Sequence, residues 1–338
     1  MHNKTCIIIV GPTAVGKTSL SIELAKQFNT SIISADSRQC FIELNIGVAK
    51  PSLEQLHAVK HYFINSHHIN EEVNAAVFER LALEWADEIF KHNNVAVMVG
   101  GTGLYVKAFA EGLDEVPPSS TEIRNNIIST YNEKGIAWLQ QEIKERDPLY
   151  FAEGEIYNPQ RMMRALEVVI VSGNSILSFR KGEQKKRPFD VLTIGLEKPK
   201  TILYEQINRR VDEMIEAGLV EEVRKLIPFR ELNALQTVGY KELFEFFDGK
   251  IKLEKSIELI KQNTRHYAKR QLTWFKRNRN IHWFDSAEML ACTAFEINVQ
   301  LFCYCVRLKY SYPQLVDNFH QGAERNLMIS PPFSDFLP

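Results

Sequence analysis

The segment from residue 5 to residue 18 constrains the fold most. Thr5–Val10 is apolar and β-branched, as expected of a buried strand, and the next eight residues, GPTAVGKT, match G-x-x-x-x-G-K-[ST]. Helical spacing over residues 19–28 and a second apolar run over 31–35 follow. Strand, helix and strand in about thirty residues form a βαβ unit, which builds parallel sheets. We therefore predict an α/β fold with a P-loop-type parallel sheet flanked by helices.

The glycine loop predicts a site for a di- or polyphosphate. Gly11 and Gly16 let the backbone wrap around phosphate oxygens, and the next helix directs its positive dipole end toward them. Lys17 supplies a point charge, and the Thr18 hydroxyl suits Mg²⁺. The predicted diphosphate- or nucleotide-binding residues are Gly11, Pro12, Thr13, Ala14, Val15, Gly16, Lys17 and Thr18. The pattern does not specify ATP.

The rest of the chain predicts a core interrupted by helices. A helix over residues 77–90 and core strands at Val95–Val99 and 190–196 extend the α/β pattern, whereas residues 121–173 are helical with few strand signals. We predict core segments at residues 1–115 and 189–285, a helical insertion domain at 116–188, and a tail of unknown role at 286–338. The second core segment ends in a long helical stretch near Trp274.

Two further loops follow predicted strands. Asp36 comes directly after residues 31–35, at the edge where parallel sheets bind ligands. Its carboxylate suits a magnesium ligand or a general base, but Asp is also a common helix N-cap, and the spacing does not decide between these roles. Gly100-Gly101-Thr102-Gly103 follows Val95–Val99 and fits either a ligand loop or a structural turn.

Charge identifies one candidate nucleic-acid surface. The chain has a net charge of −1, so only a local patch can indicate RNA. Residues 264–284 contain no acidic side chain and interleave Lys and Arg with Tyr267, Trp274 and Phe275. Basic residues with aromatics suit phosphate contact and base stacking. A helix with one buried face and a solvated basic face is the alternative.

Cysteines and histidines give weaker signals. The five scattered cysteines argue against a disulfide framework, and Cys303-x-Cys305 lacks a second ligand pair for zinc. The histidines between His57 and His68 have no partner at convincing metal-ligand spacing, so we expect structural roles. The N-terminal apolar run is too short for a signal peptide or membrane span. We expect a cytoplasmic protein that does not contact membranes.

Six ordered blocks give the chain a resemblance to a known family. GPTAVGKT, ADSRQ, VGGTGLY, QRMMRALEV, QTVGYKE and TRHYAKRQLTWFKR, spread over residues 5–285, are similar to the blocks of the tRNA dimethylallyltransferase (tRNA isopentenyltransferase) family. The resemblance implies transfer of a dimethylallyl group from its diphosphate to the exocyclic amine of the adenosine 3′ to the anticodon, with Mg²⁺ as cofactor. We expect a monomer.

The resemblance also implies residue roles. Lys17, Asp36 and Thr102 would be catalytic, with Asp36 accepting the proton or orienting the amine, and Arg210 would add a diphosphate contact. A solvated helix arginine is the alternative for Arg210. The residues implied to bind the tRNA anticodon stem-loop are Asp36, Ser37, Arg38, Gln39, Thr102, Arg124, Gln160, Arg161, Met162, Met163, Arg164, Gln236, Thr237, Val238, Gly239, Tyr240, Lys241, Lys269, Arg270, Gln271, Trp274 and Lys276.

Two other functions fit parts of the pattern. A P-loop small-molecule kinase using ATP would employ the helical insertion as a lid, with Arg161 and Arg164 as its arginines. A non-catalytic RNA-binding protein would retain the fold without the chemistry. The intact Lys17, Thr18, Asp36 and Thr102 argue against the second alternative.

Overall fold

A computed structural model describes residues 4–287 of the chain. It contains two compact units, which are described separately: one holds residues 4–110 and 187–287, and the other holds residues 111–186. Most of the predicted tail, with Cys303 and Cys305, lies outside the described residues.

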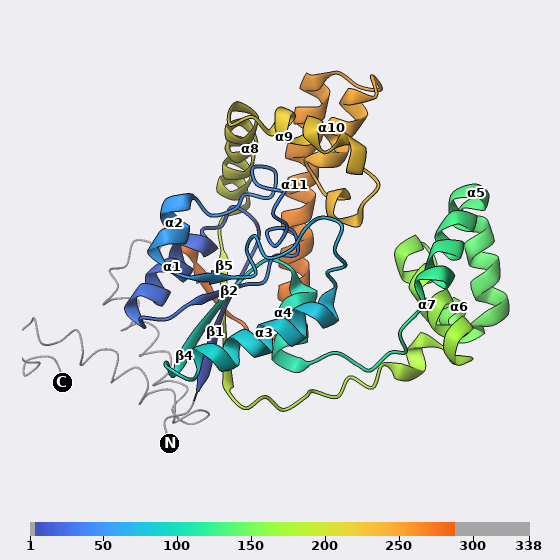
Figure 1. Cartoon of the computed structure of the whole chain (residues 1–338), viewed down its shortest axis with the longest axis horizontal. Helices are drawn as coiled ribbons and strands as arrows, with labels where there is room; N and C mark the ends of the chain where they lie inside the picture. The colour runs from blue at the N-terminus through green and yellow to red at the C-terminus, as the bar shows by residue number, and fades with distance from the viewer. Residues whose placement is uncertain (1–3, 288–338) are drawn as a thin grey trace, which may run out of the picture. The chain divides into compact units, whose positions relative to one another are not determined.

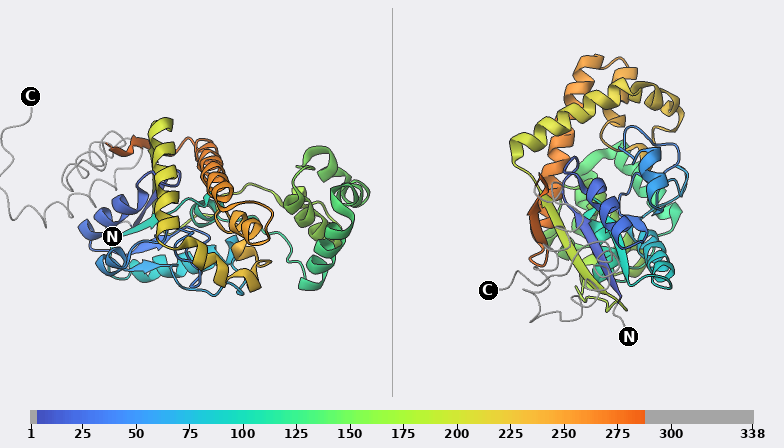
Figure 2. Two further views of the ribbon diagram at one scale, coloured as in Figure 1. Left: turned by 90° about the horizontal axis from the view of Figure 1, so that it is seen from above. Right: turned by 90° about the vertical axis from the view of Figure 1, so that its left-hand side faces the viewer.

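The first unit is built on a six-stranded, all-parallel sheet. The strand order is β3-β2-β4-β1-β5-β6, so β1 lies in the middle between β4 and β5. Figures 1 and 2 show these strands side by side with helices packed around them. The bounds are β1 Thr5–Val10, β2 Ile32–Ser34, β3 His61–Tyr62, β4 Val95–Val99, β5 Asp190–Glu197 and β6 His282–Asp285. The predicted fold class is confirmed.

Alternation along β1 feeds two hydrophobic cores. Cys6 and Ile8 belong to the core on one face, which also contains residues of the helices at Ala75–Ile89 (α3), Gly103–Glu111 (α4), Tyr240–Phe247 (α10) and Leu253–Phe275 (α11). Ile7 and Ile9 belong to the core on the other face, which also contains residues of the helices at Lys17–Gln27 (α1) and Lys200–Glu216 (α8). Because both faces are covered, every residue of β1 is buried, which explains its unbroken apolar run.

The helices of this unit follow the predicted pattern with different bounds. They are α1 Lys17–Gln27, α2 Leu53–Ala58, α3 Ala75–Ile89, α4 Gly103–Glu111, α8 Lys200–Glu216, α9 Leu219–Lys225, α10 Tyr240–Phe247 and α11 Leu253–Phe275. Helix α1 begins at Lys17 instead of residue 19, so the lysine and Thr18 form its first turn. In residues 4–287, no helix is long and apolar enough to cross a membrane.

The second unit is helical and has a core of its own. It contains α5 Thr121–Arg146, α6 Pro148–Glu153, α7 Pro159–Ser172 and the 3-10 helix η1 Ile176–Phe179. Helix α5 is interrupted at Gly135, whose φ of 73° and ψ of −169° are not helical. Leu139, Ile143 and Met162 are fully buried in this core.

Candidate active site

The loop between β1 and α1 has the backbone geometry of a phosphate cradle. Gly11 has a φ of 146°, and a Cβ there would lie 2.5 Å from the Leu196 carbonyl oxygen. Gly16 has a φ of 104° and directly precedes the first turn of α1. Both positions therefore require glycine. Residues 13–19, from the loop and the first turn of α1, line one cavity, so a helix N-terminus lies at this cavity, as in many anion sites.

The Lys17 side chain is hydrogen-bonded to the phosphate loop itself. Its Nζ donates to the carbonyl oxygens of Gly11, at 3.0 Å, and Pro12, at 2.7 Å. Burial lowers the pKa of Lys17 to about 7, the charge of Asp36 opposes this shift, and Arg210 adds to it. A bound diphosphate would restore the ammonium form, because a neighbouring opposite charge favours the charged state.

Asp36 caps a turn and also faces the site. Its Oδ1 accepts from the backbone N–H groups of Arg38, at 2.9 Å, and Gln39, at 3.3 Å. The following residues form turns and no helix, so the N-cap alternative takes the form of a capped turn. In the part of the chain that the structure describes, no protein group donates to Oδ2. One carboxylate thus has a structural oxygen and a second oxygen for chemistry.

The second glycine loop packs against the Asp36 turn. A Cβ on Gly100 would lie 2.3 Å from the Ala35 carbonyl oxygen, so this close approach needs glycine. The Thr102 hydroxyl accepts from the Ser37 N–H at 3.0 Å and donates to the Ser37 Oγ at 3.3 Å. Trp274 of α11 lies against Gly103 at the start of α4. Thr102 therefore supports the turn that carries Asp36.

Gln271 of α11 joins the two loops. Its Oε1 accepts from the Thr13 N–H at 2.8 Å, and its Nε2 donates to the Gly101 carbonyl at 3.0 Å. The side chain is buried. It therefore contributes to the shape of the phosphate loop, beside the RNA role implied for it from the sequence.

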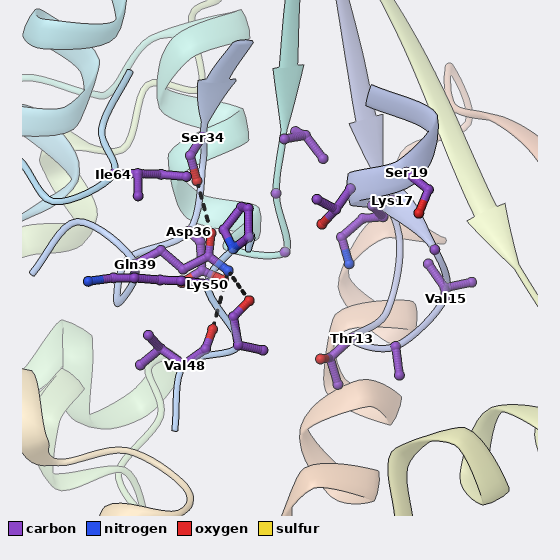
Figure 3. Close-up of a pocket in the computed structure, with 18 of the residues that line it drawn as sticks. Thr13, Val15, Lys17, Ser19, Ser34, Asp36, Gln39, Val48, Lys50 and Ile64 are labelled. Carbon is purple, nitrogen blue, oxygen red and sulfur yellow. Dashed lines mark hydrogen bonds between the residues drawn. The ribbon is translucent and has the colours of Figure 1, made fainter. Parts of the chain in front are cut away.

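One cavity of about 310 Å³ brings these parts together. Figure 3 shows Thr13, Val15 and Lys17 on one side of it and Asp36 and Gln39 on the other. The charged residues that line it are Lys17, Lys50, Arg210 and the single carboxylate Asp36. This positive balance suits a polyanion. Other lining residues are Ala14, Gly16, Thr18, Gly101, Tyr267 and Gln271.

A second cavity of about 120 Å³ adjoins the first. Thr13, Asp36, Arg210 and Tyr267 are among the residues that line both cavities. Its other walls are largely apolar, and they include Val48, Ile207, Val211, Met214, Leu219, Val238 and Ile260. An ionic region and an apolar region therefore meet at Asp36 and Arg210.

The residues predicted to bind RNA occupy different places. Arg38, Thr237, Val238 and Gly239 line the second cavity, and Gln39 and Gln271 line the first. Exposed members on the first unit are Gln236, Lys241, Lys269, Arg270, Trp274 and Lys276. Arg124, Gln160 and Arg161 are exposed on the second unit.

For three residues of that set, the predicted contact with RNA is wrong. Met162 and Tyr240 are fully buried, and Met163 is 5% exposed. They offer RNA no surface, because they fill the cores that hold α7 and α10 in place. Arg164 is half-buried, and its guanidinium donates to Glu167 and to the Pro117 carbonyl.

Lys50 and His61 also line the first cavity, although the sequence pattern gave neither a role there. Tyr267, expected as an aromatic of the basic stretch, lines both cavities. Burial, with the charge of Asp36, raises the pKa of Tyr267 to about 12, so its phenol stays protonated. Tyr267 precedes Gln271 by four residues, so helical spacing places both side chains on one face of α11. That spacing could have identified Tyr267 as a residue that lines the site. His61 Nδ1 donates to the Val59 carbonyl oxygen at 2.8 Å, while its buried Nε2 has no protein partner among the described residues.

Metal ligands are sparse around this site. In residues 4–287, no group of three or more His, Cys, Asp or Glu side chains can hold a metal ion. The Thr18 hydroxyl and the Asp36 carboxylate are among the side-chain oxygens of the cavity lining that suit Mg²⁺. That donor set fits Mg²⁺, which commonly takes one or two protein ligands together with substrate phosphates and water.

A parallel α/β sheet, a phosphate loop and a facing carboxylate define a P-loop protein that binds a di- or polyphosphate. Comparison with known proteins is more specific. The family model described as IPP transferase matches residues 39–278. The chain therefore belongs to the IPP transferase family, and the resemblance seen in the sequence is confirmed. This assignment favours prenyl transfer over the phosphoryl transfer of a kinase.

Individual relatives agree with the family assignment. The chain is 46% identical to a tRNA dimethylallyltransferase of Cytophaga hutchinsonii, over 87% of this chain and 96% of the relative. It is 50% identical to one from Christiangramia forsetii, over 83% and 93%. A crystal structure of a tRNA isopentenylpyrophosphate transferase from Bacillus halodurans has 32% identity and a TM-score of 0.64, covering 96% of this chain and 99% of that one. A eukaryotic dimethylallyltransferase acting on tRNA has 26% identity and a TM-score of 0.70, covering 84% and 74%.

Proposed function

We propose that this chain transfers a dimethylallyl group from dimethylallyl diphosphate to the exocyclic amine of the adenosine 3′ to the anticodon in tRNA. One observation supports this most directly: the phosphate loop and Asp36 line a single cavity from opposite sides (Figure 3). A donor gripped by its diphosphate would direct its allylic carbon toward Asp36. The amine would approach from the Asp36 side.

The proposed reaction is one substitution. The N6 nitrogen forms a bond to C1 of the dimethylallyl group, the C1–O bond breaks, and diphosphate leaves with the electron pair. Lys17 and Arg210 stabilise the charge on that leaving group, and the loop N–H groups hold it in place. Mg²⁺, bound through Thr18, would supply further charge neutralisation. The Asp36 carboxylate accepts the proton from N6 through Oδ2.

The tRNA surface that we propose combines basic and aromatic side chains. Lys269 and Arg270 are exposed on α11, and Trp274 lies one turn further along the same helix. A base in an anticodon loop can be extruded at a cost of a few kcal/mol and read by stacking and edge contacts. The tRNA substrate implies a cytoplasmic reaction. A monomer suffices, because one chain lines both cavities.

The test of this function uses unmodified tRNA, Mg²⁺ and dimethylallyl diphosphate labelled in the prenyl group. We expect label in the RNA and release of one diphosphate per prenyl group transferred. A parallel reaction with γ-labelled ATP should transfer no phosphate. Phosphoryl transfer from ATP without prenylation of RNA, under any condition tried, would overturn the proposal.

A second test addresses the RNA surface. The variant K269A/R270A should weaken tRNA binding and lower the slope of log Kd against log salt by about one for each cation that contacts phosphate. Binding of inorganic diphosphate should stay unchanged. Lys255→Ala, at the other end of α11, is the matched control. An unchanged salt slope in the double variant would remove these two residues from the interface.

A further inference from the structure

The 45–50 loop forms a wall of both cavities. Val48 and Ala49 line both, Lys50 lines the first, and Gly47 lines the second. The loop is not part of a helix or strand, so it has no ladder of hydrogen bonds to fix it. Ala49 also has a φ of 50°, a left-handed conformation that a non-glycine residue adopts only when its surroundings impose it.

Glu222 of α9 holds this loop from one side. Its Oε2 accepts from the N–H groups of Asn45, at 3.2 Å, and Ile46, at 2.7 Å. Its Oε1 accepts from the Gly47 N–H at 3.0 Å. Three consecutive backbone N–H groups therefore converge on one carboxylate, an arrangement that binds an anion strongly.

Tyr240 completes this contact. Its hydroxyl donates to Glu222 Oε1 at 2.6 Å, and its ring lies so close to Gly47 that a Cβ there would be 2.6 Å from it. Tyr240 is fully buried, so the ring is fixed in place by the core. The tyrosine thus orients the carboxylate and limits how far the loop can move.

The other side of the loop is tied to the turn that carries Asp36. The Gln39 amide donates to the carbonyls of Val48, at 3.2 Å, and Ala49, at 3.0 Å, as the dashed lines of Figure 3 show. The Gln39 backbone N–H donates to Asp36 Oδ1. A displaced loop would therefore shift the carboxylate that faces the substrates.

From these contacts we infer that Glu222 and Tyr240 are positioning residues for prenyl transfer. They fix the 45–50 loop, and through Gln39 the loop fixes Asp36 relative to the bound donor. This inference rests on the proposed function. It also separates two parts of the site, because the phosphate loop, which would bind the diphosphate, lies across the cavity from Asp36 and Gln39 (Figure 3). Loss of the contacts of Glu222 and Tyr240 with the 45–50 loop should therefore slow the reaction and leave diphosphate binding unchanged.

The test compares Glu222→Gln with Glu221→Gln, a matched control on the same helix whose side chain is exposed and pairs with Arg224. In E222Q the new NH₂ group faces N–H or O–H groups that had donated hydrogen bonds to the carboxylate, so these hydrogen bonds are lost. We expect hydrogen exchange at the amides of residues 45–47 to accelerate at least about tenfold, and kcat to fall about 10- to 100-fold, since small misplacements have effects of this size. The Kd for inorganic diphosphate with Mg²⁺ should change less than about twofold. E221Q should match wild type in all three measurements.

A second variant keeps the test decisive if E222Q folds poorly. Tyr240→Phe retains the ring against Gly47 and removes only the hydrogen bond to Glu222, so it should lower kcat by a smaller factor, again with diphosphate binding intact. Normal amide exchange in E222Q, or faster exchange with normal kcat, would overturn the positioning role. Equal losses of kcat and diphosphate affinity would do so too. If wild-type protein never prenylates tRNA, the proposed function is overturned. This outcome is distinguishable, because amide exchange at residues 45–47 reports on the Glu222 contacts without any reaction.

Discussion

At the scale of single residues, Asp36 has a structural oxygen and a reactive oxygen, and substitutions can separate them. Asp36→Asn keeps an oxygen that can accept from the Arg38 and Gln39 N–H groups but cannot take a proton. We expect kcat to fall about 10²- to 10⁴-fold, the range of general-base effects, with Tm and tRNA affinity unchanged. Asp36→Ala should add a stability loss of about 1 kcal/mol from the uncapped turn. Single-turnover rates and thermal denaturation would check both variants. Tm distinguishes the two variants, because only Asp36→Ala loses the capping oxygen. Equal losses of kcat and tRNA affinity in Asp36→Asn would contradict the base assignment.

Lys17 makes diphosphate binding depend on pH. With its pKa lowered to about 7 in the free protein, Lys17 loses its charge as the pH rises through that value. Binding of diphosphate favours the ammonium form, so above pH 7 the complex takes up a proton and the affinity falls by up to about tenfold per pH unit. Titration calorimetry at pH 8 in buffers of different ionisation enthalpy would measure this uptake. In Lys17→Arg the charge persists, so the uptake should shrink to that of diphosphate itself; an equal uptake in both proteins would contradict the prediction.

The same shift affects stability in the opposite direction. An unfolded lysine has a pKa near its ordinary value of 10.5, so the folded chain binds fewer protons than the unfolded chain between about pH 7 and 10.5. Burial of Lys17 therefore destabilises the ligand-free protein below pH 7, and this penalty is relieved as the pH rises. A buried lysine that lowers the stability of the ligand-free protein in this way is typical of a residue whose role is to bind a ligand.

At the scale of elements, α11 links the loops that form the site. Gln271→Ala leaves the Thr13 N–H and the Gly101 carbonyl without their partner, which should destabilise the fold by about 1–3 kcal/mol and weaken diphosphate binding. Gln262→Ala, an exposed glutamine on the same helix, is the matched control. Urea denaturation and diphosphate titration would measure the two effects. A Gln271 variant that loses only tRNA affinity would contradict the bridging role.

Elements with strong local patterns could be predicted from the sequence, and those formed by pairing could not. The runs of β1 and β4 gave their bounds because burial on both faces demands unbroken apolar residues. The edge strands β3 and β6 have two and four residues and exist through pairing with β2 and β5, which no local pattern encodes. Gln271 illustrates the same limit within the site, since its partner Thr13 lies 258 positions away.

At the scale of the whole molecule, the chain has separate hydrophobic cores in its two units. The core around Leu139 contains only residues of the 111–186 unit, whereas Leu243 belongs to a core of the unit with the phosphate loop. Both side chains are fully buried, so each substitution to alanine should cost its own unit about 2–5 kcal/mol. Cores that share no residues need not unfold together.

We therefore expect calorimetry to resolve two thermal transitions. Diphosphate with Mg²⁺ should raise the Tm of only one transition, that of the unit with the phosphate loop. At a diphosphate concentration of 100 times Kd, the free energy of unfolding of that unit should increase by about 2.7 kcal/mol. Leu139→Ala should lower only the other transition, and Leu243→Ala should lower only the ligand-sensitive one. A single transition, whose Tm shifts with the ligand and with both substitutions, would show that the two units unfold together. Stabilisation of one unit would then also stabilise the other, to which it is joined at residues 110–111 and 186–187. Two independent transitions would instead mean that the phosphate grip is stabilised within the first unit alone.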